Sequence, residues 1–165
     1  MNKLHEAYLN LGSNIEPESH LQKAIELLRT YGIVIAISTV WESHAVGESG
    51  PNFLNVCVLF KTKNTVKLLK SSVIRPIEAQ LGRVRSTDKN APRTIDIDIV
   101  IFDGQLLRPE YWDTIYTVVP LAELNPNFEH PQTHEKLSQA AQQLRASTWI
   151  QSRADISIPI QQQNI

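Results

Sequence analysis

Two carboxylates stand two residues apart in the segment Ala91–Phe102, which reads APRTIDIDIVIF. Alternate side chains of a β-strand share a face, so Asp96 and Asp98 should project together, about 7 Å apart along the strand. This alternation places Ile95, Ile97, Ile99 and Ile101 on one face, and Asp96, Asp98, Val100 and Phe102 on the other. In proteins, Mg²⁺ is typically held by one or two carboxylates plus substrate phosphates. The spacing alone leaves open a cation site or a solvated polar strand face.

Three arginines near this segment favour the first interpretation. Arg83 and Arg85 lie on a polar loop that we predict to be mobile, and Arg93 directly precedes the acidic strand. A guanidinium group binds phosphate through a bidentate fork. Solvent exposure would explain one or two arginines, but the combination with the acids indicates a metal–polyphosphate site. The chain has no GxxxxGK[ST] motif, so a nucleotide would be held in another way.

A second group of residues could recognise a flat heterocycle. Phe53 and Asn55 share a strand face at the end of the loop 44–52, which contains Gly47, Gly50 and Pro51. An aromatic face can stack on a ring, and an asparagine amide offers a donor and an acceptor to the ring edge. The alternative is that Phe53 belongs to the core and Asn55 caps a turn.

The secondary structure pattern predicts how these residues are positioned. We predict strands at 6–10, 33–42, 53–61 and 94–102, helices at 19–32, 65–81 and 134–144, and a short fifth strand at 116–119. Ser19 is the predicted helix cap, and Pro76 should kink or split the second helix. The order βαββαβ predicts a ferredoxin-like α+β fold, an antiparallel sheet with helices on one face and a C-terminal extension. Residues 1–150 would form one domain, followed by a partly disordered tail at 151–165.

The composition excludes several classes of protein. The 165 residues have a net charge of −1, so general affinity for nucleic acid is not expected. No stretch approaches the roughly 20 apolar residues of a membrane span, and the first residues do not read as a signal peptide. Cys57 is the single cysteine and should be a small buried hydrophobe. We expect a soluble cytoplasmic protein, either a monomer or a homodimer.

Four segments together resemble a known family. They are YLNLGSN at 8–14, PNFLN at 51–55, GRVR at 82–85 and PRTIDIDIVIF at 92–102. In this order they are similar to the 6-hydroxymethyl-7,8-dihydropterin pyrophosphokinases of folate biosynthesis, over residues 8 to about 131. The resemblance implies a ferredoxin-like fold and transfer of pyrophosphate from ATP to the pterin hydroxymethyl group, with release of AMP. It also implies two Mg²⁺ ions, with ATP as co-substrate.

The resemblance assigns roles to individual residues. Asp96 and Asp98 would bind the two Mg²⁺ ions, and with Arg83, Arg85 and Arg93 they would form the catalytic set. The pterin would contact Ser43, His44, Val46, Phe53, Asn55 and Tyr116, and ATP would contact Glu78, Arg83, Arg93, Ile99 and Tyr111. From its position alone, Glu78 could equally be a surface acid. A divergent relative that uses another pterin or only binds, and an interaction module without chemistry, are the competing hypotheses.

The segment 106–121 departs from the family pattern, as do the residues before the PRT motif. The segment 106–121 is about two residues shorter than the family pattern. Within it, Glu110 replaces an expected histidine, and Thr114 is the residue nearest to the position of an expected arginine. Asn90 stands where a tryptophan is usual, and Ala91 replaces a glycine before the PRT motif. Loss of cationic contacts would weaken the hold on ATP and the transition state by a few kcal/mol. Arg108, Trp112 and Asp113 are the candidates to compensate.

Overall fold

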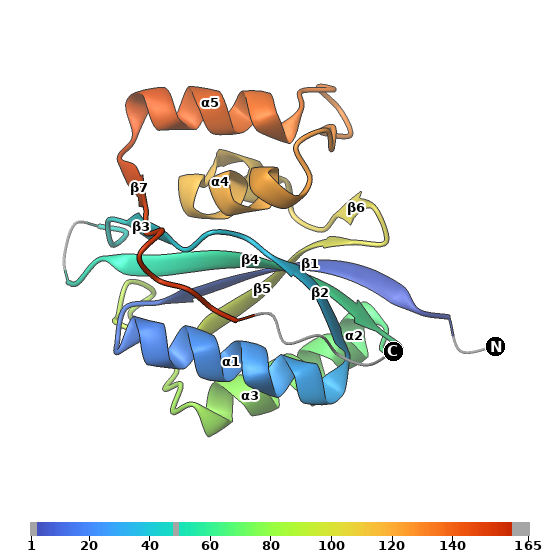
Figure 1. Ribbon diagram of the computed structural model, residues 1–165, viewed down its shortest axis with the longest axis vertical. Helices are drawn as coiled ribbons and strands as arrows, with labels where there is room; N and C mark the ends of the chain where they lie inside the picture. The colour runs from blue at the N-terminus through green and yellow to red at the C-terminus, as the bar shows by residue number, and fades with distance from the viewer. Residues whose placement is uncertain (1–2, 48–49, 160–165) are drawn as a thin grey trace.

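A seven-stranded antiparallel sheet forms the centre of the computed structural model, which describes residues 3–47 and 50–159 (Figure 1). The strands are β1 (His5–Ser13), β2 (Ile33–Ile37), β3 (Trp41–Ser43), β4 (Phe53–Thr62), β5 (Asp96–Phe102), β6 (Gln105–Leu106) and β7 (Ile150–Ser152). Their order across the sheet is β6-β5-β1-β4-β3-β7, and β2 also pairs with β4. Antiparallel partners flank the central strand β1 on both sides.

Helices cover both faces of this sheet. They are α1 (Pro17–Tyr31), α2 (Val66–Leu68), the π-helical turn η1 (Leu69–Ile74), α3 (Arg75–Gln80), the 3₁₀ turn η2 (Pro109–Asp113), α4 (Ile115–Leu124) and α5 (Leu137–Ser147). Figure 1 shows α1 and α3 below the sheet and α4 and α5 above it. The predicted βαββαβ unit, with its two helical segments on one face, is confirmed. The C-terminal extension supplies the helices of the opposite face.

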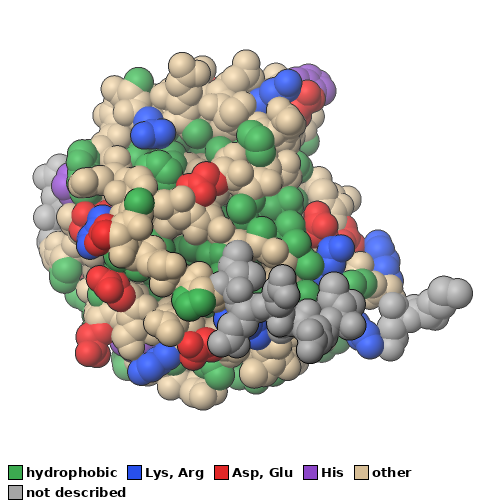
Figure 2. Space-filling model, in the orientation of Figure 1, with side chains coloured by type: hydrophobic (Ala, Val, Ile, Leu, Met, Phe, Trp, Pro, Cys, Tyr) green, Lys and Arg blue, Asp and Glu red, His purple; other side chains and the backbone are tan. Residues whose placement is uncertain are grey.

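Burial on both faces explains the apolar character of the central strands. In β1, Leu9 and Leu11 face a core built with α1 and α3, whereas Tyr8 belongs to the core under α4 and α5. Cys57 is buried in this second core, and burial raises the pKa of its thiol, as expected for a structural cysteine. On the surface view of Figure 2, acidic and basic side chains are interspersed, in agreement with the small net charge.

A β-bulge corrects the predicted facing of β5. Tyr8 pairs with Ile101 but Leu9 pairs with Ile99, so Val100 is an extra residue in the ladder. A bulge shifts the alternation by one residue. Ile101 therefore joins the core under α4, and Phe102 joins the core beside α1, the reverse of our prediction. Residues before the bulge, including both acids, keep the predicted alternation.

The short strand predicted at 116–119 is wrong, because this segment lies in helix α4. Its run of Tyr, Thr and two Val residues favours a strand by local propensity. In the folded chain, α4 lies between the sheet and α5, and it buries Ile115, Thr117, Val118 and Val119. Burial on nearly all sides outweighs the helix propensity cost of these residues, at most about 0.7 kcal/mol each. Tyr116 is consequently presented from the first turn of a helix.

Other boundaries also differ from those predicted, among them that of the last helix, which begins at Leu137 rather than at His134. Helix α1 begins at Pro17 rather than after Ser19, since the fixed φ of proline suits the first helical position. The strand predicted at 33–42 is divided into β2 and β3. The prediction that Pro76 splits its helix is confirmed. The π-helical turn η1 ends at Ile74, and α3 begins at Arg75, directly before the proline.

The segment after residue 150 contributes to the fold. Strand β7 pairs with β3, and Ile156 and Ile158 pack against the core next to α1. Residues 151–159 are therefore part of the folded unit rather than a disordered tail, and residues 160–165 lie outside the described part of the chain. In the part that is described, no helix has the length and apolar character needed to cross a membrane.

Candidate active site

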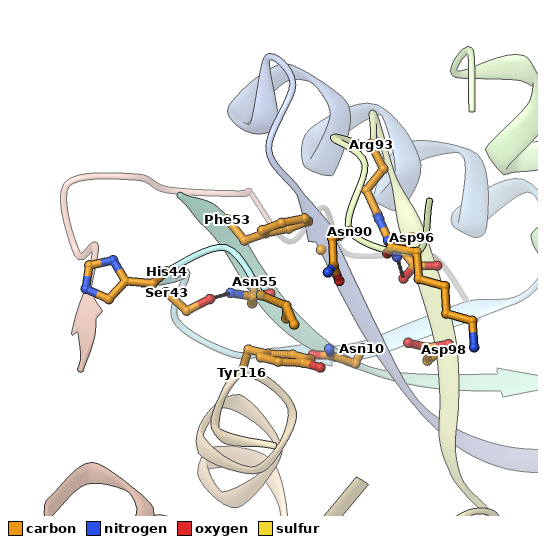
Figure 3. A pocket seen from close by; sticks show the side chains of 13 residues that line it. Asn10, Ser43, His44, Phe53, Asn55, Asn90, Arg93, Asp96, Asp98 and Tyr116 are labelled. Carbon is orange, nitrogen blue, oxygen red and sulfur yellow. Dashed lines mark hydrogen bonds and ion pairs between the residues drawn. The ribbon is translucent and has the colours of Figure 1, made fainter. Parts of the chain in front are cut away.

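A cavity of about 220 Å³ opens at the end of β1, β4 and β5, on the side of the sheet covered by α4 (Figure 3). Its walls come from segments far apart in the sequence. They are Asn10, Gly12, Ser43, His44, Val46, Phe53, Asn55, Lys89, Asn90, Arg93, Asp96, Asp98 and Tyr116. All six residues predicted to contact a pterin and both predicted metal ligands thus line one cavity.

Two aromatic rings form opposite walls of this cavity. Figure 3 shows Phe53 on one side and Tyr116 on the other, with the Asn55 amide between them. The Asn55 Nδ2 atom donates to Ser43 Oγ at 2.8 Å and to the Trp41 carbonyl at 3.3 Å, which fixes the amide. A Cβ atom at Gly12 would lie 3.1 Å from Asn55 Oδ1, so glycine keeps the floor open. A slot with these walls suits a flat ring that has polar edges.

The two acids lie in this cavity beside a buried amide. Asp98 is opposite Asn10 in the β1–β5 ladder, and Asp96 is opposite Gly12. Burial raises the pKa of Asp98 to about 6, the charges of Asp96 and Glu78 add to the rise, and Arg108 and Arg93 oppose it. The buried Asn10 Oδ1 atom has no hydrogen-bond partner within the described residues. Two carboxylates and an unpaired amide oxygen form an oxygen donor set that fits Mg²⁺.

The described residues include no cluster of three or more His, Cys, Asp or Glu side chains able to hold a metal by themselves. A Mg²⁺ ion bound here would have to complete its shell with water and substrate phosphates.

A second cavity, of about 420 Å³, adjoins the first and is strongly basic. It is lined by Arg83, Val84, Arg85, Ser86, Asp88, Lys89, Ala91, Arg93, Asp96 and Arg108. Lys89, Arg93 and Asp96 belong to the walls of both cavities. The structure therefore brings the three predicted arginines together and connects their cavity to the aromatic slot at Asp96.

Arg93 is held rigidly at this junction. Its Nη1 atom donates to Asp96 Oδ2 at 2.9 Å, and its Nη2 atom donates to the Lys89 carbonyl. The buried Asn14 exchanges two bonds with the Arg93 backbone, at 2.8 and 3.1 Å, and donates to the Pro51 carbonyl at 3.3 Å. Asn14 thus ties the arginine to both β1 and the loop before β4.

Two buried guanidinium nitrogens remain available to an anion. The Nε atoms of Arg83 and Arg93 have no hydrogen-bond partner among the described residues. Burial lowers the pKa of Arg83 below its ordinary value, whereas Asp96 and Glu78 support its charge. A buried charged donor without a partner is costly, and a phosphate oxygen would satisfy it.

Glu78 is not a surface acid, since its exposed fraction is 3%. Its Oε2 atom accepts from the Ile97 backbone N–H at 3.3 Å, and its Oε1 atom accepts from Arg85 Nη2 at 3.1 Å. Burial raises the pKa of this carboxyl, and the bond from Ile97 opposes the rise. Glu78 lines neither described cavity. It joins α3 to the acidic strand and holds Arg85, and its contact with ATP stays a prediction.

Replacing Glu78 with alanine should lower the free energy of unfolding by about 1–2 kcal/mol. The substitution leaves a buried backbone N–H and an arginine without their acceptor. Glu78→Gln keeps an acceptor oxygen at the same distance from the backbone and should lower the free energy of unfolding by less. Urea denaturation of the three proteins gives the comparison, and equal stability of the alanine variant and the parent would contradict this structural role.

Besides Glu78, two more residues predicted to contact ATP line neither cavity. Ile99 is buried in the core beside α1, facing away from Asp98, so any contact with a ligand would come through its backbone. Tyr111 packs against the core under α4, and the Arg108 guanidinium lies 6.0 Å from its ring centroid. Both assignments stay predictions.

Several cavity residues were missed by the sequence analysis. Asn10 had a usable signal, because it is a polar residue between two leucines in a central strand. Lys89 and Asn90 reach the slot from the loop before β5, and no spacing pattern indicates this. Of the three residues considered as compensation, Arg108 lines the basic cavity. Trp112 is instead buried, with its Nε1 donating to Glu135 at 2.8 Å, and Asp113 is exposed.

Comparisons with known proteins agree with this arrangement. Residues 8–126 match the family model described as 7,8-dihydro-6-hydroxymethylpterin-pyrophosphokinase (HPPK). The 2-amino-4-hydroxy-6-hydroxymethyldihydropteridine pyrophosphokinase of Aquifex aeolicus is 38% identical over 136 residues, covering 75% of this chain and 82% of the relative. The protein of the same name from Methylorubrum extorquens is 38% identical over 133 residues, covering 73% and 83%.

A solved structure shows the same fold within a longer protein. Wild-type HPPK-DHPS of Plasmodium falciparum superposes with a TM-score of 0.70 at 14% identity, over 87% of this chain. The chain spans 45% of that longer protein. The fold, the aromatic slot joined to a basic cavity, and the match over most of its length together show that this chain belongs to the 7,8-dihydro-6-hydroxymethylpterin-pyrophosphokinase family.

Proposed function

We propose that the protein transfers pyrophosphate from ATP to the hydroxymethyl group of 6-hydroxymethyl-7,8-dihydropterin and releases AMP, a step of folate synthesis. The observation that carries the proposal is the junction of the two cavities at Arg93 and Asp96. A transfer between two substrates needs the acceptor and the donor to meet at one point. The aromatic slot supplies a place for the pterin, and the basic cavity supplies one for the polyphosphate.

The metal is part of the proposal. Asp96 at the junction, together with Asp98 and the unpaired oxygen of Asn10 in the adjoining slot, would hold Mg²⁺. When bound, Mg²⁺ would neutralise phosphate charge and lower the pKa of the attacking hydroxyl. A divalent cation would also favour the ionised form of Asp98, whose pKa is raised by burial and, to a smaller extent, by the nearby acids.

The reaction requires alignment and charge stabilisation rather than a covalent intermediate. The pterin hydroxyl oxygen bonds to the β-phosphorus, the bond from that phosphorus to the α–β bridging oxygen breaks, and AMP leaves with this oxygen. The hydroxyl proton passes to solvent. Phe53 and Tyr116 orient the pterin, while Arg83 and Arg93 stabilise charge on the transferring phosphates with donors that are already buried in place.

Arg108 supplies a cation that the altered segment 106–121 otherwise lacks. It lines the basic cavity, and its Nε atom lies 3.4 Å from Glu110, the acid that replaces the expected histidine. The ion pair reduces the repulsion that Glu110 would exert on a phosphate. This supports an active enzyme rather than a pterin-binding protein without activity.

One assay tests the proposal directly. The protein is incubated with ATP, Mg²⁺ and 6-hydroxymethyl-7,8-dihydropterin, and AMP and the pterin diphosphate are quantified by chromatography. We expect both products in equal amounts, dependent on all three components. A folded protein that binds the pterin but forms no AMP would instead support the divergent binding protein.

Location and assembly are further parts of the proposal. We expect the reaction in the cytoplasm, where a free cysteine such as Cys57 persists without a disulfide partner. The assembly of the protein, as a monomer or a homodimer, stays a prediction.

A further inference from the structure

Trp149, in the C-terminal extension, lies against a wall of the aromatic slot. Its ring stacks on the ring of His44, with centroids 4.3 Å apart and an interplanar angle of 24°. His44 lines the slot, whereas Trp149 is not among its lining residues. A residue more than 100 positions away in the chain thus contacts the segment that borders the pterin side of the site.

The His44 ring does not point into the slot. Figure 3 shows it directed away from Asn55 and Tyr116, so this residue borders the slot chiefly through its backbone. On the outer side, the ring is held between Trp149 and Asn52, whose Oδ1 atom lies 3.2 Å from His44 Nδ1. The side chain therefore serves as an anchor for the backbone of the segment Ser43–Val46.

The strand that follows Trp149 strengthens this anchor. In the ladder between β3 and β7, Ser43 is opposite Ile150. Ser43 in turn accepts from the Asn55 amide at 2.8 Å, the group placed to read the edge of a ring. Two connections thus run from the C-terminal extension to the slot, one through His44 and one through Ser43.

We propose that Trp149 is a positioning residue for the pterin, acting through His44 to hold the backbone of Ser43–Val46 at the wall of the slot. This inference rests on the proposed function, since it assumes a pterin in the slot. Trp149 is 40% exposed. Its stacking partner, His44, does not line the basic cavity. Loss of the Trp149 ring should consequently weaken the binding of the pterin without weakening the binding of ATP.

The test is calorimetric titration of Trp149→Ala with 6-hydroxymethyl-7,8-dihydropterin and, separately, with ATP and Mg²⁺. Loss of one aromatic stacking contact should raise the Kd for the pterin about three- to tenfold. The Kd for ATP should change less than about twofold. Trp149→Phe keeps an aromatic ring and should restore most of the affinity. Tyr31→Ala removes an aromatic side chain of similar exposure, 42%, from the end of α1 and serves as the matched control.

The double variant His44→Ala/Trp149→Ala separates positioning from a general loss of stability. Because Trp149 acts through His44, the two substitutions together should weaken pterin binding no more than His44→Ala alone does. Additive losses, equal losses for pterin and ATP, or an unchanged Kd in Trp149→Ala would each overturn the inference. The parent protein separates failure of this inference from failure of the proposed function. If the parent protein binds the pterin, only the role of Trp149 is overturned; if the parent protein binds no pterin, the proposed function fails as well.

Discussion

Asp98→Ala should lower the rate of AMP formation at least about a thousandfold while the protein stays folded, and Asp96→Ala should do the same. Asp96 lies where the two cavities meet, and Asp98 lines the aromatic slot, so each substitution removes a carboxylate from the proposed metal site. Electrostatic stabilisation at a phosphoryl group is worth several kcal/mol in a buried site, so loss of a metal ligand is severe. The rate is measured by AMP release at saturating ATP and pterin, over a range of Mg²⁺ concentrations.

The stability of Asp98→Ala distinguishes lost chemistry from lost structure. The pKa of Asp98 is raised in the folded protein, chiefly by burial, so the folded state binds the proton more tightly than the unfolded chain. Its ionisation at neutral pH therefore opposes folding. We expect the variant without metal to melt at the same temperature as the parent or higher. A lower Tm together with the lost rate would indicate a structural role instead.

A distant acid provides the matched control for both substitutions. Glu26 is exposed on α1, which covers the other face of the sheet. Glu26→Ala changes the net charge by the same amount as the aspartate substitutions and should leave the rate of AMP formation unchanged. Retention of more than a tenth of the rate by both aspartate variants would refute the metal assignment.

Phe53→Ala should weaken pterin binding about 10- to 100-fold and leave the binding of ATP within about twofold. Stacking of a flat ring on an aromatic side chain contributes about 1–3 kcal/mol. Among the described lining residues, Phe53 and Tyr116 are the two whose rings form walls of the slot, since the His44 ring points away from it. Phe53 does not line the basic cavity, so ATP should not sense the substitution. Calorimetric titration with each ligand separately gives the two constants.

Phe53→Tyr is the conservative partner of this substitution, since it keeps the ring and should bind the pterin nearly as well as the parent. Phe53→Leu keeps apolar bulk without a flat face and should resemble the alanine variant. Equal losses of pterin and ATP affinity in Phe53→Ala would mean that the ring supports the fold of the site rather than stacking on the substrate.

Local patterns were sufficient for the central part of the site. Alternation in β5 placed both acids on one face, and that face does line the slot, because the strand is regular from Asp96 to Ile99. Phe53 and Asn55 reach the same slot for the same reason, since β4 begins at Phe53 and keeps its period of two. Strand alternation is a property of a few covalently linked residues, and a sequence displays it directly.

Other features depend on residues distant in the chain. The facing of Ile101 and Phe102 depends on a bulge in the pairing with β1, and the helical state of Tyr116 depends on burial of α4 between the sheet and α5. Strand alternation predicted the opposite facing for Ile101 and Phe102, and local propensity predicted a strand at Tyr116. The connection of the two cavities through Arg93 likewise depends on Asn14, which is 79 residues away.

By itself, then, the sequence determined the types of chemical group and the elements that carry them: paired acids, an aromatic ring and an amide on strands, and three arginines on a loop. The tertiary structure alone decided that these groups surround two joined cavities, that Glu78 is a buried support, that Arg108 lines the basic cavity, and that Trp149 stacks on His44. The reason is physical. Side-chain direction within a strand follows from local geometry, whereas burial and long-range contacts follow from how the whole chain packs.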